Sequence, residues 1–275
     1  MFDLNSLGKS AKVAAAELSK LNDKKRNSAL LTVAKLLREN ASYLIEENAA
    51  DIRLATEKGA TAAFIDRLTL NNKVIESMAF GLEQVAELES PLGKCVYSYE
   101  NKEQGISINK ITAPFGVIGI IYESRPNVTA DAFALCFKTA NAVILKGGSD
   151  SLRSNLAIAK VIKKALKDEG IDQNAISVIE DTSRQTTAEF MRLNKYVDLL
   201  IPRGSASLIK AAVENSTIPI IETGSGNCHV YVDESANAEM AADVIFNAKT
   251  QRYSVCNALR IVSYSLFGAK YFTVN

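Results

Sequence analysis

Apolar side chains recur at helical spacing through the first 90 residues of the chain. Leucine and alanine return every three or four positions from Leu30 to Leu44, and charged residues occupy the other faces. The same pattern returns between Leu68 and Leu88. A stripe of this kind predicts amphipathic helices that bury one face and leave the other in water. Polar residues at Asn22 and from Thr69 to Asn72 predict breaks or caps between these helices.

The pattern changes after a Pro-Leu-Gly turn at residues 91–93. From about residue 96 to residue 112, polar and apolar residues alternate, which predicts a β-hairpin with its turn near Asn101 to Gly105. A two-stranded hairpin alone is marginally stable in water. We therefore expect this hairpin to pack on another surface, and a neighbouring subunit of a homo-oligomer is one candidate.

Short apolar strands alternate with amphipathic helices from residue 117 to residue 221. The expected strands are Val117–Ile121, Ala142–Leu145, Ile176–Ile179, Val197–Ile201 and Ile218–Ile221. The expected helices are Asn127–Thr139, Ser151–Asp168, Gln185–Leu193 and Ser205–Glu214. Such an order indicates a parallel sheet covered on both faces. The sequence therefore predicts an α/β fold whose doubly wound, Rossmann-like domain, with the N-terminal helices, spans residues 1–221.

The segments that follow these strands are rich in Gly, Ser, Asn, Lys and Arg. Because such sheets bind ligands beyond the carboxyl ends of their strands, this composition predicts a phosphate-bearing ligand there. Lys146 follows a strand and precedes two glycines, which suits a ribose or phosphate contact, although a surface lysine would fit the same pattern. Gly204 and Ser205 open a helix, whose N–H groups can meet a pyrophosphate. The chain has no GxGxxG or Walker motif.

Ser124, Arg125 and Asn127 follow the first strand of the expected sheet and form a candidate substrate-binding group. The planar guanidinium of Arg125 suits a carboxylate or a phosphate. Asn127 has a second interpretation, as the N-cap of the next helix.

Composition narrows the class of protein. The 275-residue chain has a net charge of +1, which gives no argument for a nucleic-acid partner. Its longest apolar runs are too short to span a membrane, and its N-terminus lacks the pattern of a signal peptide. The four cysteines have no CxxC spacing and there is a single histidine, so neither a disulfide framework nor a metal site is expected. We expect a cytoplasmic protein with reduced thiols.

A second candidate site lies in residues 222–258, which we expect to begin another domain. Glu222 ends an apolar run, and an expected strand, Cys228–Val232, and helix, Asn237–Thr250, lead to Cys256 in a polar loop. A strand-end carboxylate and a loop cysteine are two parts of a covalent-catalysis site. The plainer alternatives are a small core cysteine and a carboxylate that caps backbone N–H groups.

Other residues of this kind have simpler interpretations. His229 alternates with its neighbours along the expected strand, which favours a structural role. Cys95, Cys136 and Cys228 are expected to be buried thiols.

Five separate motifs resemble one known family. They are APFGVIGIIYESRPN (113–127), ILKGGSD (144–150), IPRGS (201–205), IETGSGNCHVYVD (221–233) and AKTQRYSVCNA (248–258). Over about residues 5–258, with the motifs in the same order, the chain resembles the gamma-glutamyl phosphate reductase family. These enzymes are also called glutamate-5-semialdehyde dehydrogenases and belong to the aldehyde dehydrogenase superfamily. The ESRPN and KTQR segments argue against a generic aldehyde oxidiser.

The resemblance implies an activity and its site residues. The implied reaction is NADPH-dependent reduction of L-glutamate 5-phosphate to the 5-semialdehyde, in proline biosynthesis, with glutamate 5-kinase as a pathway partner. It implies Cys256 as nucleophile, Glu222 at the position of the superfamily's general base, and Lys146 as the ribose-binding lysine. Gly204 and Ser205 fall on the turn that replaces a Rossmann glycine loop. The residues alone leave NADPH and NADH both open.

The chain also departs from the family. Tyr253 stands where family members have proline, and the tail from Leu259 to Asn275 does not resemble the family. We expect a C-terminally truncated chain, with a frameshift near codon 259 as the leading explanation. The alternative function is an inactive fragment that binds nucleotide or a subunit without turnover.

Overall fold

The computed structural model describes residues 3–222, 226–251, 255 and 257–265. The chain forms two compact units, Met1–Glu222 and Thr223–Asn275, which are considered separately below. Cys256 lies outside the described residues. Within the described part, no helix has the length and apolar character that crossing a bilayer requires.

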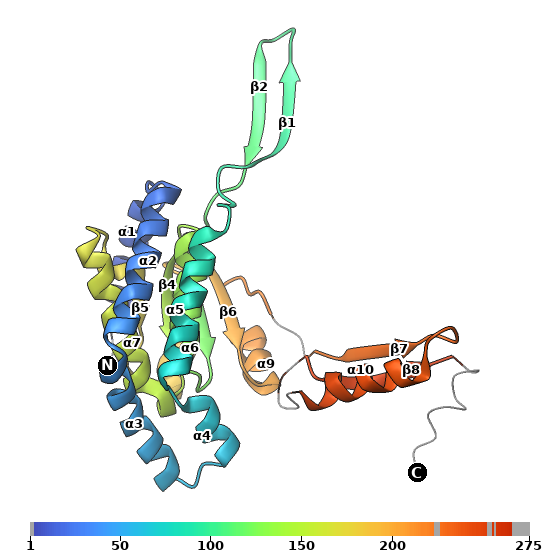
Figure 1. Ribbon diagram of the computed structural model, residues 1–275. Helices are drawn as coiled ribbons and strands as arrows, with labels where there is room; N and C mark the ends of the chain where they lie inside the picture. Colours follow the sequence, from blue (N-terminus) through green and yellow to red (C-terminus); the bar gives the residue numbers. More distant parts are fainter. Residues whose placement is uncertain (1–2, 223–225, 252–254, 256, 266–275) are drawn as a thin grey trace. The chain divides into compact units, whose positions relative to one another are not determined.

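Five helices begin the first unit (Figure 1). They are α1 (Leu4–Leu18), α2 (Asp23–Glu39), α3 (Ala41–Glu57), α4 (Ala62–Leu68) and α5 (Asn72–Glu87). The predicted caps are confirmed: Asn22 Oδ1 accepts from Lys25 N at 2.8 Å, and Asn71 Oδ1 accepts from Val74 N at 2.9 Å. Each bond satisfies a backbone donor that the first helical turn leaves without a partner.

The centre of this unit is a parallel sheet with strand order β5-β4-β3-β6. Its strands are β3 (Val117–Tyr122), β4 (Ala142–Lys146), β5 (Ile176–Val178) and β6 (Leu199–Arg203). The helices between and after them are α6 (Asn127–Lys138), α7 (Leu152–Asp168), α8 (Arg184–Phe190) and α9 (Ala206–Asn215), and short 3₁₀ turns, Ser149–Ser151 and Gln173–Ala175, precede α7 and β5. The predicted doubly wound parallel sheet is confirmed.

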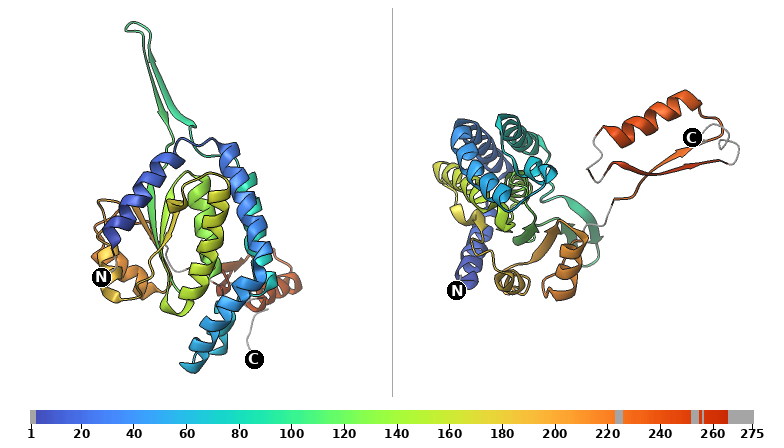
Figure 2. Two further views of the ribbon diagram at one scale, coloured as in Figure 1. Left: turned by 90° about the vertical axis from the view of Figure 1, so that its left-hand side faces the viewer. Right: turned by 90° about the horizontal axis from the view of Figure 1, so that it is seen from below.

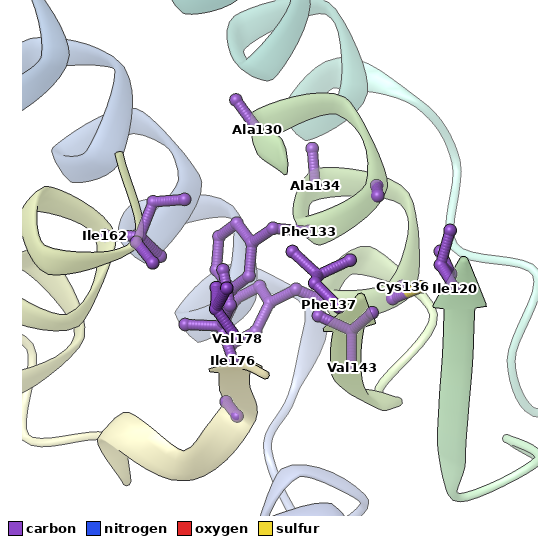
Figure 3. Packing of buried hydrophobic residues seen from close by; sticks show 14 of the residues in the cluster. Ile120, Ala130, Phe133, Ala134, Cys136, Phe137, Val143, Ile162, Ile176 and Val178 are labelled. Atoms are coloured by element: carbon purple, nitrogen blue, oxygen red, sulfur yellow. The ribbon is translucent and has the colours of Figure 1, made fainter. Parts of the chain in front are cut away.

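Helices cover both faces of this sheet. A side chain on Gly119 of β3 would meet Phe190 of α8, whereas Ile120 points toward Cys136 and Phe137 of α6 (Figure 3). Because neighbouring strand residues point to opposite faces, α6 and α8 lie on opposite sides of β3. Phe133 and Phe137 stack with ring centroids 5.0 Å apart in the core of the α6 face. Helices α2 and α5 pack outside α6, and α1 packs directly on β3 to β5 (Figure 2).

Three predicted elements differ from the structure. The helix expected at Gln185–Leu193 is α8, which ends three residues earlier, at Phe190. The strand expected at Val197–Ile201 is β6, which begins two residues later. The strand expected at Ile218–Ile221 is a single bridge between Leu200 and Ile220. Pro219 has no N–H to donate to a ladder, and it takes part only through its carbonyl, which accepts from Leu200 N at 2.8 Å.

The predicted hairpin is confirmed as β1 (Cys95–Asn101) paired antiparallel with β2 (Ile106–Ile111). The register places two tyrosines and two isoleucines on one face, together with two polar residues, and four polar residues on the other face. The first face has Tyr97, Tyr99, Ile106, Ile108, Asn101 and Lys110, and the second has Ser98, Glu100, Ser107 and Asn109. All four apolar side chains are exposed, between 47% and 57%. Cys95 is exposed as well, so its expected burial is wrong, because the hairpin has no layer packed over it in this unit.

The second unit contains β7 (Cys228–Val232), α10 (Ala238–Thr250) and β8 (Leu259–Tyr264). The first two agree with the prediction, and Asn237 caps α10 by accepting from Met240 N at 3.0 Å. Strand β8 was not predicted. It pairs parallel with β7 and completes a two-stranded sheet.

Candidate functional site

The candidate site lies where the strand order reverses. From β3 the chain adds β4 and β5 on one side, and then returns to add β6 on the other side of β3. In open parallel sheets such a reversal leaves a crevice at the carboxyl ends of the strands. Glu123 follows β3 and Gly204 follows β6 at this point, and Glu123 N donates to Arg203 O at 3.3 Å.

A cavity of about 370 Å³ opens at this edge. Strand ends and the loop after β4 supply Tyr122, Glu123, Ser124, Lys146 and Asp150. Phe64 of α4, Thr187 of α8 and Leu208 of α9 supply its other sides. Apolar side chains from two helices, α4 and α9, around a few polar groups at strand ends suit a small organic ligand that carries charge.

Lys146 is the buried cation of this cavity. Its side chain is only 5% exposed, and its Nζ donates to the neighbouring Gly147 carbonyl at 3.2 Å. Within the described residues it forms no ion pair. Burial lowers the pKa of this ammonium group, and the Asp181 carboxylate offsets part of that shift. A buried ammonium with donors to spare can bind the hydroxyl or phosphate oxygens of a ligand.

The two glycines after Lys146 lie close against neighbouring side chains, which a Cβ at either position would crowd. A Cβ on Gly147 would lie 2.3 Å from Asn155 Nδ2, and a Cβ on Gly148 would lie 3.0 Å from Ser124 Oγ. Both glycines also line the cavity, so bare backbone forms part of its wall.

A buried hydrogen-bond chain supports this loop from behind. The Tyr122 hydroxyl lies 2.8 Å from Thr129 Oγ1, which donates to Asn155 Oδ1 at 3.1 Å. Asn155 Nδ2 donates to Ser151 Oγ at 3.1 Å, next to the loop. Burial raises the pKa of the Tyr122 hydroxyl, so it stays protonated.

Gly204 and Ser205 begin α9 as expected, but their contact is with a residue that the sequence did not single out. Ser205 N donates to Glu123 Oε1 at 2.9 Å. A Cβ on Gly204 would lie 2.7 Å from Glu123 Cδ, so only glycine permits this approach. Ser205 Oγ accepts from Leu208 N at 3.4 Å and caps the helix. The sequence signal for Glu123 was a carboxylate placed directly after a buried strand.

The three candidate substrate residues do not share one environment. Ser124 lines the cavity, and its hydroxyl donates to Asp150 Oδ2 at 3.4 Å. Arg125 is exposed beside the cavity, without lining it. Asn127 is the first residue of α6 and donates to Asp131 Oδ2 at 3.1 Å. The N-cap is Pro126, so the capping alternative for Asn127 is wrong.

The proposed covalent-catalysis residues remain sequence predictions. Glu222 is exposed at the end of the first unit, and Cys256 lies outside the described residues. In the second unit, His229 lies on β7 with its Nδ1 2.6 Å from Asn227 O, a contact within its own segment. Among the described side chains, no group of His, Cys, Asp or Glu is arranged to hold a metal ion.

Comparison with known proteins gives the class. A family model described as "Aldehyde dehydrogenase family" matches residues 3–261. The chain therefore belongs to the aldehyde dehydrogenase family, and its parallel sheet with a ligand cavity at the strand ends is the α/β fold of that family.

Within this family, the chain is similar to gamma-glutamyl phosphate reductases. The protein of that name from Carboxydothermus hydrogenoformans is 50% identical over 259 residues, which are 94% of this chain and 62% of that relative. The crystal structure of gamma-glutamyl phosphate reductase from Thermotoga maritima has a TM-score of 0.91 at 40% identity, over 98% of this chain and 64% of that chain. The yeast (Saccharomyces cerevisiae) structure of that name has a TM-score of 0.73 at 30% identity, over 98% of this chain and 68% of that chain. The chain spans about 60% of the length of the curated relatives it matches.

Proposed function

We propose that this chain carries the cofactor-binding part and the nucleophile of an NADPH-dependent reductase of L-glutamate 5-phosphate, which forms L-glutamate 5-semialdehyde and phosphate for proline biosynthesis. The observation that carries the proposal is Lys146, a buried ammonium without an ion pair in the described residues, in a cavity at the reversal point of a parallel sheet. The similarity to proteins named gamma-glutamyl phosphate reductase supports the choice of substrate.

The residues present fit a nicotinamide dinucleotide. Lys146 offers donors for ribose hydroxyl or phosphate oxygens, and the bare backbone of Gly147 and Gly148 forms part of the same cavity wall. The first turn of α9 already holds an anion, because Ser205 N binds the Glu123 carboxylate. Apolar walls from Phe64 and Leu208 suit a flat ring. Bound NADPH supplies the hydride that reduces the acyl carbon to an aldehyde.

The chain's own residues supply the covalent chemistry in this proposal. The Cys256 thiolate attacks the acyl carbon of the substrate, a C–S bond forms, and the C–O bond to phosphate breaks, which leaves a thioester and inorganic phosphate. After reduction the C–S bond breaks, and the thiolate returns as the aldehyde leaves. No hydrolytic water is needed, so the roles open to Glu222 are to take the thiol proton or to orient the cofactor. Arg125 is the candidate partner for a substrate carboxylate or phosphate.

The reaction is tested in reverse, with glutamate semialdehyde, phosphate and NADP, on the 275-residue chain. NADPH formation is the expected result. Cys256→Ser abolishes it while NADPH still binds, and Cys95→Ser, which changes an exposed cysteine of the hairpin, leaves it unchanged. Turnover by Cys256→Ser would reject the thioester route. Dinucleotide binding without turnover by the unaltered chain would favour the second candidate, a nucleotide-binding or subunit-binding piece.

The hairpin supports a homo-oligomer as the working state of this enzyme. One face of β1 and β2 exposes two tyrosines and two isoleucines, which a second subunit would remove from water. Glutamate 5-kinase, as the source of the acyl phosphate, is the proposed pathway partner, and the cytoplasm is the proposed location.

A further inference from the structure

The Glu123 carboxylate occupies the anion position at the start of α9. Its Oε1 accepts from Ser205 N at 2.9 Å, and its Cγ and Cδ lie against the Cα of Gly204. Helix N-termini favour anions because their free N–H groups and the helix dipole both point at the ligand. A carboxylate on this N–H is therefore bound in the way that a phosphate group would be.

The same backbone is the proposed contact of the cofactor's diphosphate. Gly204 has no left-handed conformation to explain a glycine, and a Cβ there would clash with Glu123 Cγ, Cδ and Oε1 at 2.7–2.9 Å. The Glu123 carboxylate therefore lies against Gly204, on the N–H that a diphosphate would use. A diphosphate on Ser205 N and the Glu123 carboxylate cannot occupy it together.

The Glu123 side chain is free to leave this position. Its backbone is fixed, because its N–H donates to Arg203 O at 3.3 Å and its carbonyl accepts from Arg125 N at 2.7 Å. Its side chain is exposed, so rotation about its own bonds takes the carboxylate into water. A surface carboxylate held by one backbone N–H is released at small cost.

We propose that Glu123 is an internal competitor of the dinucleotide: its carboxylate binds Ser205 N–H in the free chain and yields that position to the cofactor's diphosphate, so that Glu123 sets the affinity for cofactor. This inference rests on the proposed function and adds to it a residue that weakens cofactor binding. It also explains why a glutamate and a glycine from different strands meet at this edge.

The test compares the chain with Glu123→Gln and Glu123→Ala, which remove the charge or the whole competing group. Titration calorimetry with NADPH and with inorganic pyrophosphate gives two dissociation constants for each protein. Both constants are expected to fall by about fivefold or more in the variants, as loss of a competing charge at a helix N-terminus implies. Glu180→Gln removes an exposed charge from the neighbouring strand end, outside this cavity, and is expected to change neither.

A salt control and the binding measured for the unaltered chain make the result decisive. At about 1 M salt, interactions between charges more than roughly 3 Å apart are screened. A gain in affinity that persists at this salt concentration therefore comes from freeing the Ser205 N–H, and not from a general change in charge. Unchanged or weaker NADPH binding by both variants, with normal binding by the unaltered chain, would overturn this inference alone. Failure of the unaltered chain and both variants to bind NADPH would overturn the proposed function and the inference with it.

Discussion

The Tyr122 hydroxyl and the Thr129 hydroxyl lie 2.8 Å apart, and both side chains are buried at 2% or less exposure. Tyr122 ends β3, and Thr129 lies in the first turn of α6. Through Asn155 this pair reaches the loop that follows Lys146. The cavity wall is thus fixed by a buried polar chain that touches no solvent.

Thr129→Val removes the central hydroxyl of this series of hydrogen bonds while keeping the shape of the side chain. The Tyr122 hydroxyl and Asn155 Oδ1 each lose their hydrogen bond to Thr129. The free energy of unfolding is therefore expected to fall by about 1–3 kcal/mol. Urea unfolding followed by circular dichroism measures the change. Thr129→Ser keeps the hydroxyl and is the control. Equal stability of Thr129→Val and the unaltered chain would show that the chain of bonds contributes nothing.

Gly147→Ala tests the room behind the loop. The new methyl group would lie 2.3 Å from Asn155 Nδ2, which is fully buried and cannot move away freely. We expect a loss of about 1–3 kcal/mol in stability, as for other overpacked sites, together with weaker NADPH binding. Gly81→Ala is the matched control, because its nearest neighbour lies 4.0 Å away and it sits inside α5. That variant is expected to gain about 0.5–1 kcal/mol, and a loss at Gly81 equal to that at Gly147 would contradict the account.

The Lys146→Met variant and the unaltered chain are expected to differ in stability by an amount that depends on pH. Burial lowers the pKa of Lys146 in the folded chain, so between that pKa and the ordinary value the unfolded chain binds more protons. The free energy of unfolding of the unaltered chain therefore rises with pH in this interval. We expect Lys146→Met to be the more stable protein at pH 7 and its advantage to shrink as the pH approaches about 10. A constant difference from pH 7 to pH 10 would contradict the direction of the shift.

Much of the fold could be predicted because its strands are short, apolar and separated by amphipathic helices. The strand from Val117 and the helix ending at Asp168 were predicted to within a residue. Strand β8 was missed because the tail from Leu259 was set apart from the family at the level of sequence, whereas the family model extends to residue 261 and β8 pairs with β7. Local pattern was less informative at Ile218–Ile221, where a proline inside an apolar run limits pairing to one bridge.

The candidate site was predictable only in part, because its key contact joins residues far apart in sequence. Lys146 could be found from its place after an apolar strand and before two glycines. The contact between Glu123 and Ser205 spans 82 positions, and it depends on β3 and β6 being neighbours, which no local pattern states. Asn127 shows that residue type alone does not locate a helix cap. Asparagine is a favoured N-cap residue, yet Asn127 is the first residue inside the helix.

The exposed apolar face of the hairpin predicts self-association. Ile108→Lys places a charge among Tyr97, Tyr99 and Ile106, so the oligomer is expected to dissociate. Light scattering after gel filtration measures the mass. Ser107→Lys adds the same charge to the polar face and is expected to leave the mass unchanged. A monomeric unaltered chain at micromolar concentration, or an intact oligomer of Ile108→Lys, would contradict this assignment.

The most direct measurement is the affinity of the 275-residue chain for NADPH, followed by fluorescence, before and after Lys146→Met. Loss of a charged donor to the cofactor is expected to raise the dissociation constant by about tenfold or more. Lys167→Met changes an exposed lysine of α7 and is expected to have no effect. Saturable binding that weakens only in Lys146→Met is the predicted result. An unaltered chain that does not bind NADPH, or a Lys146→Met variant that binds it equally well, would contradict the central claim.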